Sequence, residues 1–241
     1  MARGGFGRRL FRGVLIAVIA FIVLTALPVL LMRWWNPFSS AFILDASFAH
    51  WSEKDYSTHY SWVDLDDISP NAALAVIASE DQQFPFHTGF DFKSIRSAVR
   101  ENAHRKRPRG ASTISQQVAK NLFLWNGGGY VRKGLEAWFT VLIELMWPKE
   151  RILEVYLNIA QFGRGIFGVE PAARTFFRKP AARLSRPEAA TLAAVLPNPI
   201  RLRADRPSAY VLSRRDWIIG QMRGLGGREY LEEVSPRAAA H

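Results

Sequence analysis

Two adjacent acids, Glu80 and Asp81, end an apolar stretch whose residues recur at helical spacing. The negative end of the helix dipole disfavours a carboxylate there by about 0.3–1 kcal/mol, so an acid in this place invites a functional interpretation. Such a carboxylate could act as a general base if partial burial raises its pKa from about 4.3 toward the working pH. For an isolated Glu-Asp pair, two solvated surface acids are the more common case.

A second segment, 109–121, reads RGASTISQQVAKN and joins a helix start to positive charge. Thr113 and Gln116 have the spacing of a capping box, so we expect a helix to begin here with free N–H groups that favour an anion. Gln117 and Lys120 share a helical face with Thr113. The ordinary alternative is a capped surface helix.

Two further segments follow. Arg132 and Glu136 have the i, i+4 spacing of a helical ion pair, with Lys133 beside them; such a pair at the surface contributes about 0.3–0.5 kcal/mol. Residues 149–158 read KERILEVYLN, and a G-x-G-x-x-G pattern follows at 163–168. A dinucleotide site would require a preceding strand in a βαβ unit, whereas an amphipathic helix precedes this pattern. We therefore expect these glycines to permit a tight turn and close packing.

The elements that must position these residues are predicted to be mainly α-helical, in one domain over 45–230 with a flexible tail at 231–241. Apolar residues recur mostly at helical spacing, and stretches rich in Pro and Gly separate them. Helices are expected at 71–79, 92–104, 113–123, 131–147, 149–160, 171–177, 186–196 and 208–223. A short extended piece is expected at 57–63.

Residues 13–33 predict a single transmembrane helix, because about 20 uncharged, mostly apolar residues match a hydrocarbon core of roughly 30 Å. Four arginines precede the span and only Arg33 follows it closely, which puts residues 1–12 in the cytoplasm and the domain outside. A cleaved signal peptide and a buried core helix are the alternatives. The sequence WWNP at 34–37 is not typical of a cleavage site.

The net charge of +11 implies anionic partners: nucleic acid, anionic lipid or a phosphorylated substrate. Composition does not choose among them. The chain has no cysteine, which excludes disulfides and thiolate metal sites.

Together and in this order, the four segments resemble the glycosyltransferase domain of peptidoglycan synthases, glycosyltransferase family 51. The likeness is greatest to its monofunctional biosynthetic members, which carry a single anchor. The matching residues are Glu80, Asp81, Phe84, His87, Gly89 and Asp91; Gly110, Ser112, Thr113, Gln116, Gln117, Lys120 and Asn121; Arg132, Lys133 and Glu136; and Lys149 to Asn158. A weaker fifth block lies at 188–199, so the likeness covers about 68–199 and the anchor. Ala111 departs from the pattern, since many relatives have a second glycine there.

The resemblance implies a lysozyme-like helical fold and an inverting hexosyltransferase that polymerises lipid II into β-1,4-linked strands with release of undecaprenyl pyrophosphate. It implies Glu80 as the base and Glu136 as a second carboxylate that assists at the pyrophosphate or orients the cations. Lys120 and Arg132 would hold the pyrophosphate. The substrate-binding residues that it implies are Asp81, His87, Ser112, Thr113, Gln116, Gln117, Lys120, Asn121, Arg132 and Lys133.

The expected partners are lipid II, the growing glycan strand and the membrane, with cell-wall synthesis and division proteins as further candidates and no nucleic acid. No metal or other cofactor is required, although a divalent cation could stimulate the reaction. No transpeptidase activity is expected, because the chain lacks S-x-x-K and K-T-G. A lysozyme-like lytic enzyme and a non-catalytic membrane adaptor are the rival interpretations.

The segment 92–109 is expected to touch the bilayer. Phe92, Ile95, Ala98 and Val99 fall on one helical face, with six basic residues near them (Lys93, Arg96, Arg100, Arg105, Lys106 and Arg107). Basic amphipathic helices lie in the headgroup region and favour anionic lipid. A solvated surface helix followed by a basic loop is the alternative.

Overall fold

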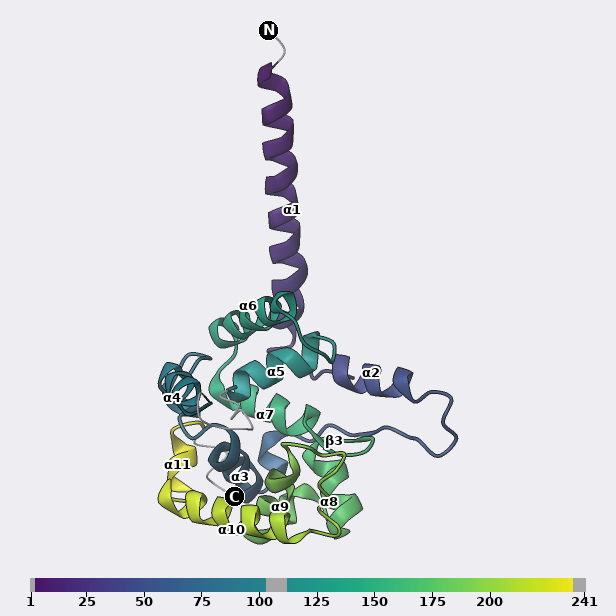
Figure 1. Cartoon of the computed structure of the whole chain (residues 1–241), viewed down its shortest axis with the longest axis vertical. Coiled ribbons are helices and arrows are strands. Elements are labelled where there is room, and N and C mark those ends of the chain that lie inside the picture. Colours follow the sequence, from purple (N-terminus) through teal and green to yellow (C-terminus); the bar gives the residue numbers. More distant parts are fainter. Residues whose placement is uncertain (1–2, 103–111, 236–241) are drawn as a thin grey trace.

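The computed structural model describes residues 3–102 and 112–235, and shows one long helix standing on a mainly helical body (Figure 1). The helices of the body are α2 (Ala41–Ala49), α3 (Pro70–Glu80), α4 (Phe92–Asn102), α5 (Ile114–Phe123), α6 (Tyr130–Met146), α7 (Lys149–Ile159), α8 (Val169–Phe177), α9 (Arg186–Val195), α10 (Ala209–Gly224) and α11 (Glu229–Glu232). Single turns of 3-10 helix lie at Leu65–Asp67, Phe84–Phe86 and Ala181–Arg183. The predicted helices are confirmed with ends within two residues, except that 103–104 lie outside the described residues.

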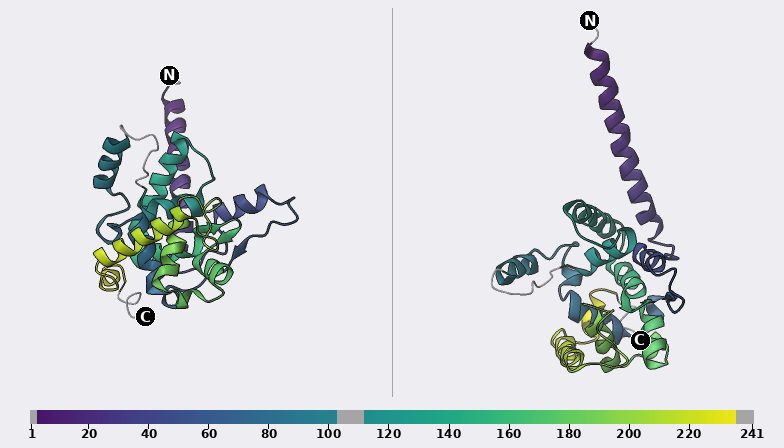
Figure 2. Two further views of the ribbon diagram at one scale, coloured as in Figure 1. Left: turned by 60° about the horizontal axis from the view of Figure 1, so that its bottom comes forward. Right: turned by 45° about the vertical axis from the view of Figure 1, so that its right-hand side comes forward.

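The long helix, α1 (Arg3–Leu31), projects away from the body in every view (Figure 1, Figure 2). Its segment Gly7–Leu31 is long and apolar enough to cross a membrane. Pro28 lies inside the helix without ending it. Apolar side chains are exposed along most of α1, whereas Val29 in its last turn is fully buried. The C-terminal part of α1 packs on the body, since Phe21 and Thr25 contact Trp138 of α6 and Val29 is buried.

Trp147, which follows α6, and Arg151 on α7 hold the end of α1 by hydrogen bonds. The Trp147 indole donates to the Val29 carbonyl at 2.7 Å. Arg151, on α7, donates to the carbonyls of Met32 at 2.9 Å and Trp35 at 3.0 Å. Because helix C-terminal carbonyls lack partners inside the helix, these bonds satisfy groups that would otherwise need water. The last turn of α1 and the body thus form one packed unit.

The centre of the body is α3, which is buried along nearly its whole length. Ser69 caps it, accepting a hydrogen bond from the Asn71 N–H, and Pro70 occupies the first turn. It packs against α9, and the alanines of both helices are at most 3% exposed: Ala72, Ala73, Ala75 and Ala78, with Ala189, Ala190, Ala193 and Ala194. Small side chains at the contact bring helix axes close together. The tightly held α3 ends at Glu80, so the position of that carboxylate is fixed by the core.

The glycine pattern forms a hairpin rather than a nucleotide-binding loop. Strand β2 (Gln161–Gly163) pairs antiparallel with β3 (Ile166–Phe167), and β1 (His59–Tyr60) pairs parallel with β3. Gly165 has φ +72°, and a Cβ there would lie 2.3 Å from the Ser57 carbonyl oxygen. Gly168 has φ +90°, and its Cβ would lie 2.6 Å from the Asn158 carbonyl oxygen. The expected tight turn and close packing are confirmed.

Two boundaries differ from the prediction. Helix α2 begins at Ala41, before the expected domain start at 45; Ser40 caps it, and its apolar sequence lacks the polar face that would have marked a surface helix. The tail expected at 231–241 is wrong for its first part, because Leu231 and Ser235 are fully buried. The Tyr230 hydroxyl donates to the Gln82 carbonyl at 2.7 Å and fixes α11 beside α3. Residues 236–241 lie outside the described part.

Candidate active site

Glu80 stands between α5 and α10 at the end of α3. The Gln117 amide of α5 donates to its Oε2 at 2.9 Å, and the Arg214 guanidinium of α10 lies 3.8 Å from its Oε1. The side chain is 16% exposed, so it is not a solvated surface acid. Burial raises the pKa of Glu80, and the Gln117 hydrogen bond and the Arg214 charge only partly oppose this. The expected upward shift is thus found, in a carboxylate held by two neighbouring helices.

Asp81 is buried and joins three parts of the site. Its carboxylate oxygens lie 2.9 Å and 3.0 Å from His87 Nε2, and one accepts the Ile114 N–H at 3.0 Å. His87 Nδ1 accepts the Gly89 N–H at 3.1 Å, so Nε2 carries the proton that is donated to Asp81. Asp81 and His87, predicted to bind substrate, therefore hold the start of α5 next to the end of α3.

The capping box at the start of α5 is present. Thr113 Oγ1 accepts the Gln116 N–H, Gln116 Oε1 accepts the Thr113 N–H, and the Thr113 hydroxyl donates to the Gly89 carbonyl at 2.6 Å. The sequence predicts free N–H groups here that would bind an anion. That expectation is wrong for the Ile114 and Gln116 N–H groups, because Asp81 and Thr113 already occupy them. The positive end of this helix does favour an anion, and the Asp81 carboxylate supplies that negative charge.

Gln117 and Lys120 lie further along α5, and each interacts with a carboxylate of the site. Gln117 accepts a hydrogen bond from the buried Tyr156 hydroxyl at 3.1 Å while it donates to Glu80, so a chain of hydrogen bonds runs from α7 to that carboxylate. Burial lowers the pKa of Lys120, and Glu136 opposes the change. The Lys120 ammonium lies over the ring of Phe42 at 5.3 Å.

Helix α6 carries a buried carboxylate surrounded by cations. Glu136 is 2% exposed; its Oε2 accepts from Arg132 at 2.8 Å and its Oε1 from the Lys133 ammonium. The interpretation of Glu136 as half of a surface ion pair is therefore wrong. Lys120 is also coupled electrostatically to Glu136. Three cations gather around one carboxylate, so the cluster keeps an excess of positive charge that suits a phosphorylated ligand.

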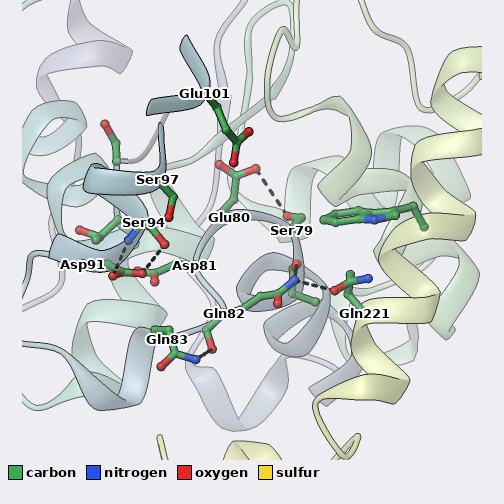
Figure 3. A pocket seen from close by; sticks show the side chains of 14 residues that line it. Ser79, Glu80, Asp81, Gln82, Gln83, Asp91, Ser94, Ser97, Glu101 and Gln221 are labelled. Atoms are coloured by element: carbon green, nitrogen blue, oxygen red, sulfur yellow. Dashed lines mark hydrogen bonds between the residues drawn. The ribbon is translucent and has the colours of Figure 1, made fainter. Parts of the chain in front are cut away.

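Beyond Glu80 lies a pocket of about 450 Å³ between the end of α3, α4 and α10 (Figure 3). Gln82 and Gln83 line it after α3, Ser94 and Ser97 on α4, and Gln221 on α10 (Figure 3). The predicted residues Asp81, Ser112 and Thr113 also line it. The site therefore has a polar pocket on one side of Glu80 and the cation cluster on the α5–α6 side.

Known proteins are similar in sequence to this chain over nearly all of its length. A family model described as transglycosylase matches residues 47–223. The chain belongs to the transglycosylase family. Proteins named biosynthetic peptidoglycan transglycosylase from Xanthomonas campestris, Cronobacter sakazakii and Yersinia pestis are 52%, 52% and 53% identical to it. These alignments cover 93%, 96% and 95% of this chain and 92%, 97% and 93% of the relatives. The resemblance read from the four segments, and the lysozyme-like helical fold that it implied, are confirmed.

Three residues on α10 of this transglycosylase were not predicted: Arg214, which lies beside Glu80, and Trp217 and Gln221, which line the pocket. They lie outside all five sequence blocks. Their spacing of i, i+3 and i+7 puts a cation, an aromatic ring and an amide on one face of a helix that was predicted, which is the signal that could have found them. Tyr156 lies inside the fourth block, but no role was given to it.

The remaining predicted residues divide between buried and exposed positions. Asn121 is 9% exposed, and its Oδ1 has no hydrogen-bond partner among the described residues. Ser112 is exposed at the pocket, and Gly110 lies outside the described residues. In the part of the chain that the structure describes, no group of three His, Asp or Glu side chains could hold a metal ion.

Proposed function

We propose that this transglycosylase polymerises lipid II into β-1,4-linked glycan strands in bacterial cell-wall biosynthesis, as the names of its relatives suggest for them. The observation that carries the proposal is a buried carboxylate of raised pKa, Glu80, near a cluster in which Arg132 and Lys133 contact Glu136 and Lys120 interacts with both carboxylates electrostatically. A glycosyl transfer with a pyrophosphate leaving group needs both of these parts.

The reaction is proposed as a single displacement. Glu80 takes the proton from the 4-hydroxyl of one disaccharide unit while that oxygen forms a bond to the anomeric carbon of the lipid-linked strand. The bond from that carbon to the pyrophosphate breaks, and its electron pair leaves with the pyrophosphate toward Lys120 and Arg132. One displacement without a covalent intermediate inverts the anomeric centre. The positive charge of the cluster supports this route without a metal, and a divalent cation would add to it.

Glu136 is proposed as a positioning residue rather than a second base. Its two oxygens each accept from a cation, Arg132 and Lys133, so it is poorly available to take a proton. The same contacts hold Arg132 and Lys133 in place on α6, where both interact electrostatically with Lys120. Preorganised charge of this kind stabilises a leaving group without reorganisation during the reaction.

A lytic glycosidase is the competing function, and the relatives' names do not support it. A hydrolase of neutral strands also has no use for the cation cluster. The test is incubation of the detergent-solubilised full chain with lipid II, and separately with preformed glycan strands. We expect polymer and free undecaprenyl pyrophosphate from lipid II, and intact strands in the second reaction. Shortened strands without polymer would contradict the proposal. No transpeptidase activity is proposed, because the chain lacks S-x-x-K and K-T-G.

We further propose that α1 spans the inner membrane once, with residues 1–12 in the cytoplasm and the body outside. Four arginines precede the span. A cleaved signal peptide is disfavoured, because Trp147 and Arg151 bind the last turn of α1. Since the chain lacks cysteine, single cysteines can test this without background. An impermeant maleimide should label Ser208→Cys but not Gly7→Cys in intact spheroplasts; the reverse would contradict the topology.

Contact between the body and the bilayer is proposed at α6. Val131, Val141 and Leu145 lie on one face, 77%, 41% and 76% exposed, opposite the buried Glu136. Trp138 on that face lies against Phe21 of α1, with ring centroids 5.7 Å apart. Helix α6 lies at the end of the body from which α1 projects (Figure 1). Brominated lipid in nanodiscs should quench a tryptophan placed by Leu145→Trp, but not one placed by Ile200→Trp; equal quenching would count against this contact.

The bilayer contact expected at 92–109 stays a prediction. Phe92 is 75% exposed, but Ala98 is 5% exposed, so the expected apolar face is partly turned inward. Nothing is described of the Val99 side chain, and the basic residues 105–107 lie outside the described part of the chain. Replacement of Phe92 by serine should weaken binding to anionic vesicles if this face meets lipid.

A further inference from the structure

Lys120 belongs to the cation cluster but has no acidic partner of its own. Both carboxylate oxygens of Glu136 accept from other cations, Arg132 and Lys133. Within residues 3–102 and 112–235, no carboxylate forms an ion pair with the Lys120 ammonium. Burial and the charges of Arg132 and Lys133 lower the pKa of Lys120, against the opposing effect of Glu136. A partly buried ammonium that two neighbouring cations repel needs another group to hold it in place.

The ring of Phe42, on α2, supplies such a contact. The Lys120 ammonium nitrogen lies 5.3 Å from the centre of this ring, within the range of about 6 Å for a cation–π interaction. The face of an aromatic ring is electronegative, so it attracts an ammonium although the ring carries no net charge. A carboxylate would neutralise Lys120 and accept one of its N–H groups. A ring holds the ammonium and leaves both its charge and its donors for a phosphate.

The helix that carries Phe42 is itself fixed to the body. The Tyr60 hydroxyl donates to the Pro37 carbonyl at 2.6 Å, just before α2 begins. Ser40 is buried and caps α2, accepting the Ile43 N–H at 3.2 Å. The Ile43 side chain is 5% exposed, and α2 packs against α5, which carries Lys120 (Figure 1). A capped and packed helix therefore places the ring, so its contact with the ammonium is preorganised.

We propose that Phe42 is a positioning residue of the pyrophosphate site: its ring holds the Lys120 ammonium by a cation–π contact and leaves the N–H donors of that ammonium to the pyrophosphate oxygens. The inference rests on the proposed function, in which Lys120 meets the leaving group. Phe42 acts through Lys120 and has no contact of its own with the reacting atoms. It lies outside all five sequence blocks, in the apolar helix that the sequence did not reveal.

The first test measures binding of farnesyl pyrophosphate to the full chain in detergent by calorimetry. Phe42→Leu removes the ring but keeps an apolar side chain, and it should weaken binding about 3- to 10-fold, the range of a cation–π contact. Phe42→Tyr keeps a ring and should stay within about 2-fold of wild type. The matched control is Phe48→Leu on the same helix, since Phe48 is 72% exposed. Unchanged binding in Phe42→Leu, or equal weakening in Phe48→Leu, overturns the proposal.

A second test separates a cation–π contact from simple packing. Phenylalanines with increasing numbers of ring fluorines, incorporated at position 42, lose negative charge on the ring face while their size changes little. Affinity for farnesyl pyrophosphate should fall stepwise along this series, and equal affinity throughout it overturns the proposal. In a Lys120→Ala background, Phe42→Leu should cause no further loss of affinity. A further loss there would show that Phe42 does not act through Lys120.

Polymerisation of lipid II, measured on the same proteins, distinguishes failure of this inference from failure of the proposed function. A wild-type protein that binds farnesyl pyrophosphate in a Phe42-dependent way but forms no polymer refutes the proposed function and leaves the Phe42–Lys120 contact standing. A wild-type protein that polymerises lipid II, with a pyrophosphate affinity that is the same in Phe42→Leu, overturns this inference alone.

Discussion

Removal of the Glu136 carboxylate should destabilise the fold by far more than a surface ion pair would. The side chains of Glu136 and Arg132 are 3% and 12% exposed, and Lys133 is 52% exposed. Breaking a buried pair costs about 3–5 kcal/mol, because the remaining charge is left without compensation, while an exposed pair contributes about 0–1 kcal/mol. Since Lys133 stays half in water, we expect Glu136→Ala to cost about 3 kcal/mol, the lower end of the buried range.

For a protein of this size, each kcal/mol lowers Tm by about 2–4 °C, so Glu136→Ala should melt about 6–12 °C below wild type. The assay is thermal unfolding followed by circular dichroism in one detergent. Glu53→Ala is the matched control, because Glu53 and its partner Arg164 are 49% and 50% exposed; it should change Tm by under about 3 °C. A Glu136→Ala protein that melts within about 2 °C of wild type would refute the buried-pair reasoning.

Four further substitutions change the charge or the hydrogen bonds of individual side chains. Burial raises the pKa of Glu80 in the folded protein, so the folded protein loses stability as pH rises from the pKa of the unfolded chain through that of the folded one. Glu80→Gln should therefore have a higher Tm than wild type at about pH 8 and an equal Tm at about pH 4. Equal Tm values at both pH values would contradict this. Arg214→Gln removes a charge that lowers this pKa, so the acid limb of the pH–rate profile should move to higher pH; an unmoved limb would exclude the coupling. Lys120→Ala should weaken binding of a lipid pyrophosphate about tenfold or more with little change in Tm, as calorimetry and melting would show. Arg151→Gln should lower Tm by several degrees, because Met32 and Trp35 lose a buried donor; an unchanged Tm would mean that the clamp is dispensable.

The helical architecture was accessible from the sequence because most helices carry local signals. Ser69 with Pro70, and Thr113 with Gln116, are caps that act within a few residues, and both are present as predicted. Glycines at 163–168 could be separated from a nucleotide-binding loop by the helix that precedes them. Helix α2 escaped prediction, since its nine mostly apolar residues show no separate polar face and so short a helix depends on packing for its stability.

The site was only partly accessible for a related reason. The segments identified Glu80, Lys120 and Glu136, whose roles stay predictions. They could not reveal that Asp81 binds the start of α5, because that bond joins residues 33 positions apart. Burial of Glu136 was likewise not visible, as an i, i+4 spacing looks the same on a surface and in a core. Trp217 and Gln221 reach the pocket only because α10 packs on α3, and no local sequence pattern predicts that packing.

Glu80 is the proposed general base of glycan polymerisation. The most direct test of this role is the initial rate of lipid II polymerisation by Glu80→Gln beside wild type, with both proteins shown to be folded by circular dichroism. The substitution keeps the size of the side chain and an acceptor and donor for Gln117, but it cannot take a proton. We predict a loss of at least about two orders of magnitude, the scale of a missing general base. A folded Glu80→Gln protein that polymerises lipid II at a near-normal rate would contradict this role of Glu80.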